Sequence, residues 1–329
     1  MSRAATYGSV YVLAASLLWG TTGTAAALAP EVGSLAVGAA AMGIGGLLQA
    51  ATGFRVVTAR RAELAAQWRT LALAAGSVAV YPLAFYTSMR LAGVAVGTVV
   101  SLGSGPVAAA VIERVVDRRP LSRRWVVGAT AALLGVVALA VARSSTAGAG
   151  TADAGSGASG SAAGTHPVWG IVLGLLAGLT YALYSWGAVR MMRRGLPSRP
   201  VMGAVFGLGG VLLMPVLLLT GAPILATGHN LATVAYLAVV PMFLGYALFG
   251  RGLAVVSAAT ATTLSLLEPA VAAVIAVLVL HEGLSVVGWV GMAVMVASLV
   301  MLTAGAGRRE PDEESVHAPV RSSALEPVL

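Results

Sequence analysis

Ten apolar stretches follow one another along this chain, each about as long as the hydrocarbon layer of a membrane is thick. A helix needs about 20 apolar residues to cross that layer. Only 10% of the residues are charged and 58% are hydrophobic, whereas soluble domains are about 25% charged. The sequence therefore predicts an all-α integral membrane protein with ten transmembrane helices. We place them at residues 8–29, 33–53, 70–89, 93–112, 125–141, 167–189, 201–220, 231–250, 253–280 and 284–303.

Two of these boundaries lack a polar loop, so chain length decides them. As one helix, residues 231–280 would extend about 75 Å, more than two thicknesses of hydrocarbon. We expect the chain to turn back near Arg251, and the same argument divides residues 70–112 near Arg90. The first stretch is long enough to span and has a relative in the second half, so we interpret it as a helix and not as a cleaved signal peptide.

Arginine carries the topology signal, because the chain has 20 arginines and no lysine. Loops on the cytoplasmic side of membrane proteins are enriched in basic residues. With the N-terminus inside, every arginine except Arg90 and Arg143 falls on the cytoplasmic side. We therefore expect a multi-pass protein of the inner (plasma) membrane with both termini in the cytoplasm.

The chain also contains an internal repeat with a constant offset. Residues 105–112 match residues 268–275, which pairs Pro106 with Pro269, and residues 15–20 resemble residues 177–182. Each unit holds five spans, an odd number, so the second unit enters the membrane from the opposite side. We predict two inverted five-helix repeats, an arrangement that recurs in secondary transporters.

The predicted repeats occupy residues 8–142 and 167–304. Between them, residues 143–166 are rich in Gly, Ala, Ser and Thr, a composition typical of a flexible linker. Residues 305–329 are charged and lack a hydrophobic pattern, so we expect a disordered cytoplasmic tail.

Three short motifs point to a known family. They are Leu18-Trp19-Gly20, Leu267-Glu268-Pro269-Ala270-Val271-Ala272-Ala273, and the turn His281-Glu282-Gly283-Leu284-Ser285. In their order and spacing they resemble the drug/metabolite transporter superfamily with paired EamA-type domains, over nearly the whole chain. In the first unit Arg119 stands where the family turn has Glu, with Asp117 nearby. The resemblance implies a ten-helix carrier for metabolites, amino acids or drugs, often an exporter, without cofactor or ATP.

Glu268 is the central acidic residue of the predicted spans and directly precedes Pro269. A carboxylate at that depth costs at least about 2.5 kcal/mol, so it should face the interior of the bundle. A carboxyl group that is neutral when buried and ionises when its cavity opens is what proton coupling requires. The alternative is a structural role, in which Glu268 bonds to neighbouring hydroxyls or pairs with Arg251.

Aromatic and hydroxyl side chains supply the other candidates for substrate contact. Such groups can stack on a substrate and hydrogen-bond to it, but they also serve as membrane-interface anchors and as bonds between helices. The repeat strengthens the case for Trp19 and Tyr181, which occupy equivalent positions. Pro106 and Pro269 are candidate helix kinks, because each lacks a backbone donor. The predicted set is Glu268, Trp19, Tyr181, Tyr184, Tyr81, Tyr86, Ser101, Thr260 and Arg251.

These features favour a secondary-active transporter that exports a small metabolite, amino acid or drug by alternating access, driven either by protons or by another gradient. The chain has no cysteine, and its four histidines lack metal-ligand spacing. It also lacks a Walker-type phosphate loop. We expect no catalytic residue, metal or cofactor, and as partners a small-molecule substrate and the lipid bilayer, not nucleic acid; a homodimer is left open. The alternatives are a membrane-embedded enzyme or lipid-handling protein that uses the same cavity, and a channel.

Overall fold

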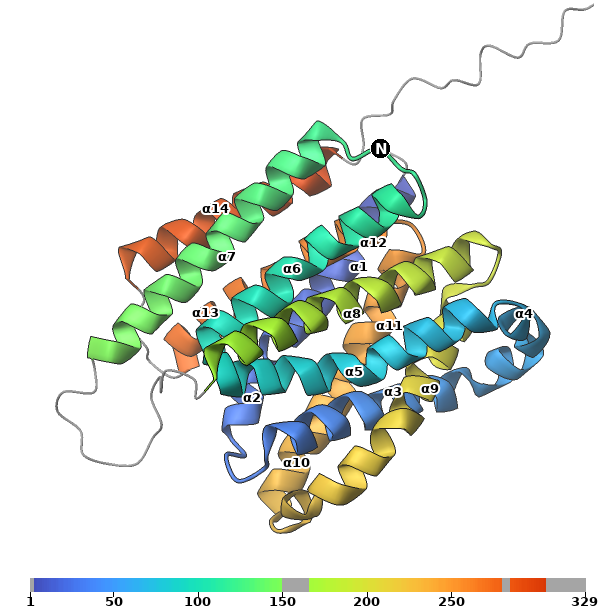
Figure 1. Cartoon of the computed structure of the whole chain (residues 1–329), viewed down its shortest axis with the longest axis horizontal. Coiled ribbons are helices and arrows are strands. Elements are labelled where there is room, and N and C mark those ends of the chain that lie inside the picture. The colour runs from blue at the N-terminus through green and yellow to red at the C-terminus, as the bar shows by residue number, and fades with distance from the viewer. Residues whose placement is uncertain (1–2, 150–165, 280–284, 306–329) are drawn as a thin grey trace, which may run out of the picture.

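The computed structural model describes residues 3–149, 166–279 and 285–305, which form helices and, within these ranges, no strand (Figure 1). The first half consists of α1 (Arg3–Gly20), α2 (Thr22–Ala27), α3 (Ser34–Ala59), α4 (Arg61–Ala66), α5 (Trp68–Ala92), α6 (Val94–Val115) and α7 (Arg123–Ala149). The second half consists of α8 (Pro167–Arg193), α9 (Ser198–Thr220), the short helix η2 (Ala222–Leu225), α10 (Gly228–Leu237), the π-helix η3 (Ala238–Gly245), α11 (Tyr246–Leu253), α12 (Ala258–Leu264), α13 (Leu267–Val279) and α14 (Val286–Gly305).

Ten segments of the described chain are long and apolar enough to cross a membrane, which confirms the predicted fold class. Three of them are interrupted helices: α1 with α2, α10 with η3 and α11, and α12 with α13. The chain turns back at residues 254–257, just after Arg251, which still belongs to α11. Between α5 and α6 it turns at Gly93, whose φ of 86° favours glycine.

Large apolar side chains cover the outside of the bundle. Leu218 and Leu219 are 84% and 86% exposed, and Val286 is 78% exposed. A continuous apolar surface of this kind would promote aggregation in water. In a bilayer the same surface meets hydrocarbon, so the exposed face matches a membrane environment.

The two halves pack through equivalent helices. The second spans of the halves, α3 and α9, lie against each other, and so do the fifth spans, α7 and α14 (Figure 1). The third span of the first half, α5, packs on α8, and its counterpart, η3 with α11, packs on α1. This set of contacts is preserved when the halves are exchanged, as expected for a duplicated unit.

The contact between α7 and α14 and the contact between α3 and α9 both depend on glycine. A Cβ added to Gly135 of α7 would lie 2.6 Å from the carbonyl oxygen of Gly291 in α14. A Cβ added to Gly210 of α9 would lie 2.7 Å from the carbonyl oxygen of Gly43 in α3. Since contacts this short exclude any larger residue, the two halves are joined where backbone meets backbone, a common solution in membranes.

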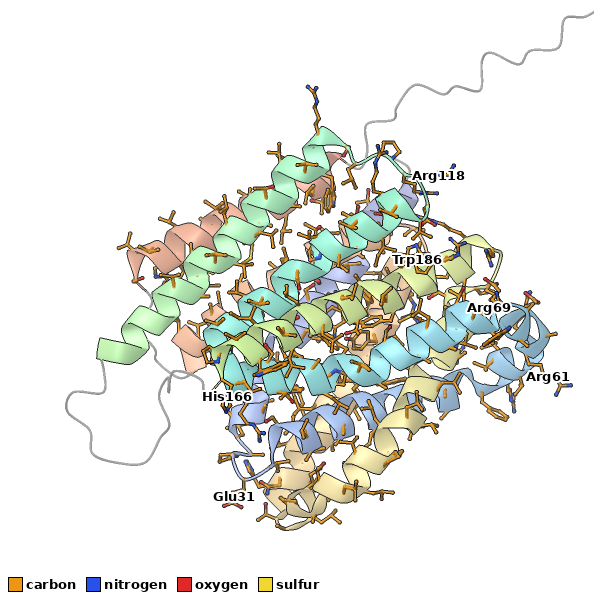
Figure 2. All side chains as sticks on the ribbon, in the orientation of Figure 1. Glu31, Arg61, Arg69, Arg118, His166 and Trp186 are labelled. Atoms are coloured by element: carbon orange, nitrogen blue, oxygen red, sulfur yellow. The ribbon has the colours of Figure 1, made fainter. Side chains whose placement is uncertain are left out.

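The two ends of the bundle differ in charge. Arg61, Arg69 and Arg118 lie toward one end, and Glu31 and His166 lie toward the other (Figure 2). We call the first the arginine-rich end; α1 also begins there (Figure 1). The assignment of this end to the cytoplasm by the positive-inside rule remains a prediction.

The predicted linker is shorter than expected, because α7 continues through Ala149 and makes residues 143–149 helical. Residues 150–165 of the linker, residues 306–329 of the tail and residues 281–284 of the turn motif lie outside the described residues.

Candidate functional site

A small cavity lies between the two halves, in contact with spans from each. Its volume is about 40 Å³, far below the roughly 300–1,000 Å³ of pockets that hold drug-sized ligands. An organic solute can therefore enter only if the surrounding helices move. The cavity is lined by Trp19, Thr22, Gly38, Ala41, Met42, Tyr81, Pro82, Phe85, Tyr86, Tyr181, Met242, Tyr246 and Glu268.

Glu268 reaches the cavity from a break in the ninth span. Helix α12 ends at Leu264 and α13 begins at Leu267, so Glu268 lies in the first turn of α13, directly before Pro269. Its backbone N–H donates to the Ser265 carbonyl at 3.0 Å. Within the described part of the chain, no side chain forms a hydrogen bond or ion pair with the Glu268 carboxylate. The carboxylate is thus available to a proton or a ligand.

Aromatic rings form most of the cavity wall. Trp19 contacts Tyr246 and Phe249, with centroid distances of 4.8 and 5.2 Å. Tyr81 lies 5.7 Å from Tyr181 between ring centroids, so α5 and α8 meet at the cavity through these rings. Trp19, Tyr181 and Tyr246 are at most 5% exposed. The rings are held in a packed cluster that joins α1, α5, α8 and α11.

The π-helix η3 fixes one side of this cluster. A π turn leaves carbonyl groups without their usual helical donors, and such turns are frequent at functional sites. The indole Nε1 of Trp19 donates to the Pro241 carbonyl at 2.9 Å, and Nε2 of Gln49 donates to the Phe243 carbonyl at 2.7 Å. Both donors are buried side chains from the first half. They stabilise the irregular backbone of the second half.

Several hydroxyl groups near the cavity already have partners. The Tyr181 hydroxyl donates to Oγ of Ser265 at 2.7 Å, and the hydroxyls of Tyr184 and Tyr246 lie 3.0 Å apart. By contrast, Oγ1 of Thr22 is buried without a partner among the described residues. Thr22 lines the cavity, so its hydroxyl is free to bond to a bound molecule.

The structure brings five of the predicted site residues together: Glu268, Trp19, Tyr81, Tyr86 and Tyr181 all line the cavity. Tyr184 lies behind them, bonded to Tyr246. The cavity lining also includes Thr22, Met42, Phe85, Met242 and Tyr246, which were not in the predicted set.

The remaining predicted residues lie elsewhere. Ser101 is buried and its Oγ has no partner in the described part of the chain, but it does not line the cavity. Thr260 bonds to Ser257 at the start of α12. Arg251 is exposed, and its Nη1 donates to the Ala247 carbonyl at 3.4 Å. The predicted alternative of an ion pair between Arg251 and Glu268 is not formed.

The two candidate kink prolines behave differently. Helix α6 is unbroken through Pro106, whereas the ninth span is interrupted three residues before Pro269. Gln49 is the contact that sequence reasoning missed. A polar amide within the apolar span 34–59 was the available signal, because buried amides in membranes bond across helices.

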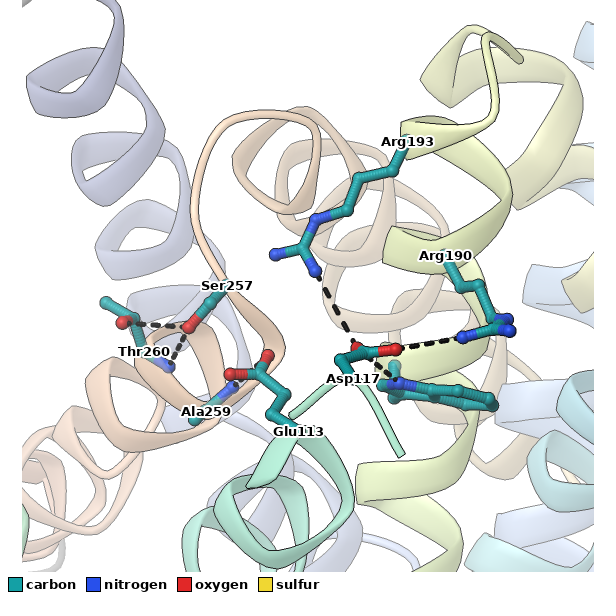
Figure 3. Close-up of polar contacts among 8 residues, drawn as sticks. Glu113, Asp117, Arg190, Arg193, Ser257, Ala259 and Thr260 are labelled. Atoms are coloured by element: carbon teal, nitrogen blue, oxygen red, sulfur yellow. Dashed lines mark hydrogen bonds and ion pairs between the residues drawn. The ribbon is translucent and has the colours of Figure 1, made fainter. Parts of the chain in front are cut away.

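A second group of polar side chains lies at the arginine-rich end, where α6 ends (Figure 3). Asp117 accepts a hydrogen bond from Nε1 of Trp186 at 2.9 Å and one from Arg190 at 2.8 Å, and Arg193 lies 3.8 Å away. One turn earlier, the buried Glu113 accepts the backbone N–H of Ala259 at 3.3 Å. These two acids connect the end of α6 to α8 and to the start of α12.

Within the described ranges, no three His, Cys, Asp or Glu side chains gather in a way that could hold a metal ion. The chemistry that the cavity offers is therefore that of one carboxyl group, several hydroxyls and an aromatic wall. Such a set can bind a small molecule and exchange a proton.

Comparison with known proteins finds bacterial relatives and a solved structure that resemble this chain over most of its length. The chain is 33% identical over 312 residues to the "Uncharacterized transporter YwfM" of Bacillus subtilis (strain 168), covering 94% of this chain and 97% of that protein. It is 28% identical to "Protein PecM" of Dickeya dadantii (strain 3937), covering 71% of this chain and 73% of PecM. One solved crystal structure superposes with a TM-score of 0.69 at 19% identity, over 90% of this chain and 96% of that one, which supports the fold alone.

A sequence model of the EamA-like transporter family matches two segments, residues 6–141 and 168–304. Together they include the ten candidate spans, apart from one end residue each at Ala142 and Pro167, and every residue that lines the cavity. The matched segments correspond to the two halves that pack through α3 with α9 and α7 with α14. The chain is a member of the EamA-like transporter family, a membrane transporter built from ten helices.

Proposed function

We propose that this transporter is a secondary carrier that exports a small organic solute by alternating access, in exchange for protons that bind Glu268. The observation that carries this proposal is the Glu268 carboxylate itself. It lines a cavity between the two halves, and no side chain in the described ranges neutralises it. An ionisable group without a partner at membrane depth is costly, so its retention favours a functional role.

The position of the cavity supports alternating access. Its lining comes from the parts of α1, α2, α3 and α5 that are remote from the arginine-rich end, together with residues near the middle of α8 and the broken ninth span. At the arginine-rich end, the bonds of Glu113 and Asp117 hold α6, α8 and α12 together. Such an arrangement is suited to a carrier that is closed on one side and opens by releasing these bonds.

Proton exchange follows from the chemistry of the carboxyl group. A protonated Glu268 carries no charge and leaves the cavity neutral, whereas an ionised Glu268 attracts a cation or a hydrogen-bond donor. If the proton and the solute bind the same group in turn, inward flow of protons drives the solute outward. This requires only one carboxyl group in the pathway, as the lining residues provide.

The test is transport by the full-length protein in proteoliposomes, with and without an imposed pH gradient, using a panel of labelled solutes. We expect at least one solute to accumulate on the acidic side against its gradient, and Glu268→Gln to abolish that accumulation. Glu31→Gln is the matched control, because it neutralises an exposed carboxylate that does not line the cavity. Accumulation by Glu268→Gln with an unchanged pH profile would overturn the proposal.

A further inference from the structure

From the charges and rings around the cavity we infer that its substrate is an organic cation with an aromatic or other apolar body, bound with its positive charge beside Glu268. This inference rests on the proposed function of the cavity and names the class of solute. It follows from three features of the lining residues.

The first feature is the charge balance of the lining. Glu268 is the sole Asp, Glu, Arg, Lys or His among the described residues that line the cavity. Arg190 and Arg193 are engaged with Asp117, and Arg251 bonds to a backbone carbonyl. An ionised carboxylate in a poorly solvated site attracts a positive charge and repels a negative one. The cavity is therefore selective for cations.

The second feature is the aromatic wall. Six lining residues, Trp19, Tyr81, Phe85, Tyr86, Tyr181 and Tyr246, are aromatic. The face of an aromatic ring is negative, so it attracts a cation placed over it, most strongly where water is excluded. The same rings provide apolar area for the body of the ligand. A cation with an apolar body satisfies both the rings and the carboxylate.

The third feature is the lack of a site for an anionic group within the lining. The carboxylate of a zwitterion would need an arginine, a histidine or a set of free N–H donors. The indole N–H of Trp19 already bonds to Pro241. The N-terminus of α13 would attract an anion, but the negative charge of Glu268 in its first turn disfavours a second one. Amino acids with a free carboxylate should therefore be excluded.

Competition between the cation and a proton then depends on Glu268 alone. The other titratable groups that line the cavity are Tyr81 and Tyr86 from α5, Tyr181 from α8 and Tyr246 from α11. Tyrosine stays neutral between about pH 5 and pH 8. The segments of α1, α2 and α3 that reach the cavity contribute Trp19, Thr22 and Met42 among others, none of which titrates in that range.

The experiment uses five indole derivatives that share one ring and differ in charge. They are tryptamine (a cation), N,N,N-trimethyltryptammonium (a permanent cation), tryptophol (neutral), tryptophan (a zwitterion) and indole-3-acetate (an anion). Binding to the purified full-length protein is measured by isothermal titration calorimetry between pH 5 and pH 8, for the unaltered protein, Glu268→Gln and the control Glu31→Gln. Transport of each compound is measured in proteoliposomes in parallel.

We expect the two cations to bind at least about tenfold more tightly than tryptophol, a difference of about 1.4 kcal/mol. The affinity for the permanent cation should fall as the pH falls, because only Glu268 can then take up the competing proton. Glu268→Gln should reduce that affinity at least about 30-fold, because it leaves the charge of the bound cation without a partner in a buried site. It should also remove the pH dependence, while Glu31→Gln changes neither.

Two results would overturn the inference. One is cation binding that is no tighter than tryptophol binding or that is unchanged in Glu268→Gln. The other is Glu268-dependent transport of tryptophan or indole-3-acetate in preference to tryptamine. The second result would leave the proposed carrier function intact and replace only the class of solute. Failure of the proposed carrier function would give a different result. Cations would bind in a way that depends on Glu268, but no solute would accumulate in response to a pH gradient.

Discussion

The fourth spans of the two halves share one sequence pattern but differ at the cavity. They are α6 in the first half and α12 with α13 in the second. The offset that pairs Pro106 with Pro269 pairs Gly105 with Glu268. Helix α6 is continuous at this point, whereas its counterpart is broken between α12 and α13. A Cβ added to Gly105 would lie 3.0 Å from the Tyr181 ring. In the first half a tyrosine from α8 thus packs where the second half has its acid.

The acids at the end of α6 show the reverse distribution. The same offset pairs Glu113 with Ala276 and Asp117 with Leu280, so the second half has no acid at these positions of its sequence. The first half therefore supplies the bonds at the arginine-rich end, and the second half supplies the carboxylate in the cavity. The two halves therefore share a fold, while different residues at a few paired positions give them different roles.

The largest difference between the halves is expected from substitutions at the paired positions 105 and 268. Glu268→Gln should abolish the solute accumulation that a pH gradient drives, a loss of at least about tenfold, equivalent to about 1.4 kcal/mol. Gly105→Ala should leave the pH dependence intact, because the Tyr181 ring needs to shift by only a few tenths of an ångström. Transport assays of both variants in proteoliposomes check this. Equal losses in the two variants would mean that the halves are not specialised.

The paired prolines provide the next test. Pro269→Ala restores a backbone donor next to the break between α12 and α13 and should reduce transport severalfold, because it favours a regular helix where Glu268 reaches the cavity. Pro106→Ala lies in a helix that is already continuous and should have a smaller effect on transport. The initial rates of solute uptake by the two variants are compared at equal amounts of protein. A larger loss in Pro106→Ala would contradict the assignment of the break to the functional site.

A third test concerns the arginine-rich end. The chain has no cysteine, so Ser185→Cys introduces a single reporter thiol at a buried position of α8. Asp117→Asn weakens the bonds to Arg190 and Trp186 by about 1 kcal/mol. A change of that size raises the fraction of molecules that are open at this end about fivefold. We expect labelling by a membrane-impermeant thiol reagent to become faster by that factor.

Glu63→Gln is the matched control for this labelling experiment. It removes an acid at the same end, but the Arg60–Glu63 ion pair is exposed and lies within one turn of the chain. Exposed pairs contribute little, so the labelling rate should not change. An equal increase in both variants would show that overall charge, and not the contact between α6 and α8, controls access.

The smallest effect on transport is expected at the π-helix, another feature of the second half. Its counterpart α5 contains Pro82 within a regular helix. Gln49→Leu removes one of two donors to the Phe243 carbonyl, which keeps the backbone N–H of Tyr246. The loss is that of one hydrogen bond, about 0.5–1.5 kcal/mol. We expect a lower melting temperature in detergent, measured by tryptophan fluorescence, with the preference among solutes unchanged. Unaltered thermal stability would show that η3 does not depend on this bond.

Much of the architecture was predictable because the membrane imposes a simple rule. Every backbone polar group in hydrocarbon must be satisfied within the protein, which restricts spanning segments to helices of a set length. The apolar stretches therefore located all ten spans to within several residues. The inward position of Glu268, which lines the cavity, was predictable for the same reason, since an acid in such a segment is costly and must face the interior.

What sequence alone determined is the number of spans, the repeat and the acid at membrane depth, because each depends on residues that are near one another in the chain or related by one offset. Tertiary structure decided which rings meet at the cavity and that Gln49 and Trp19 bond to the π-helix, contacts that join residues about 200 positions apart. It also separated Arg251 and Thr260 from Glu268. Packing between the halves determines such contacts, and a one-dimensional pattern does not encode which faces of the helices meet.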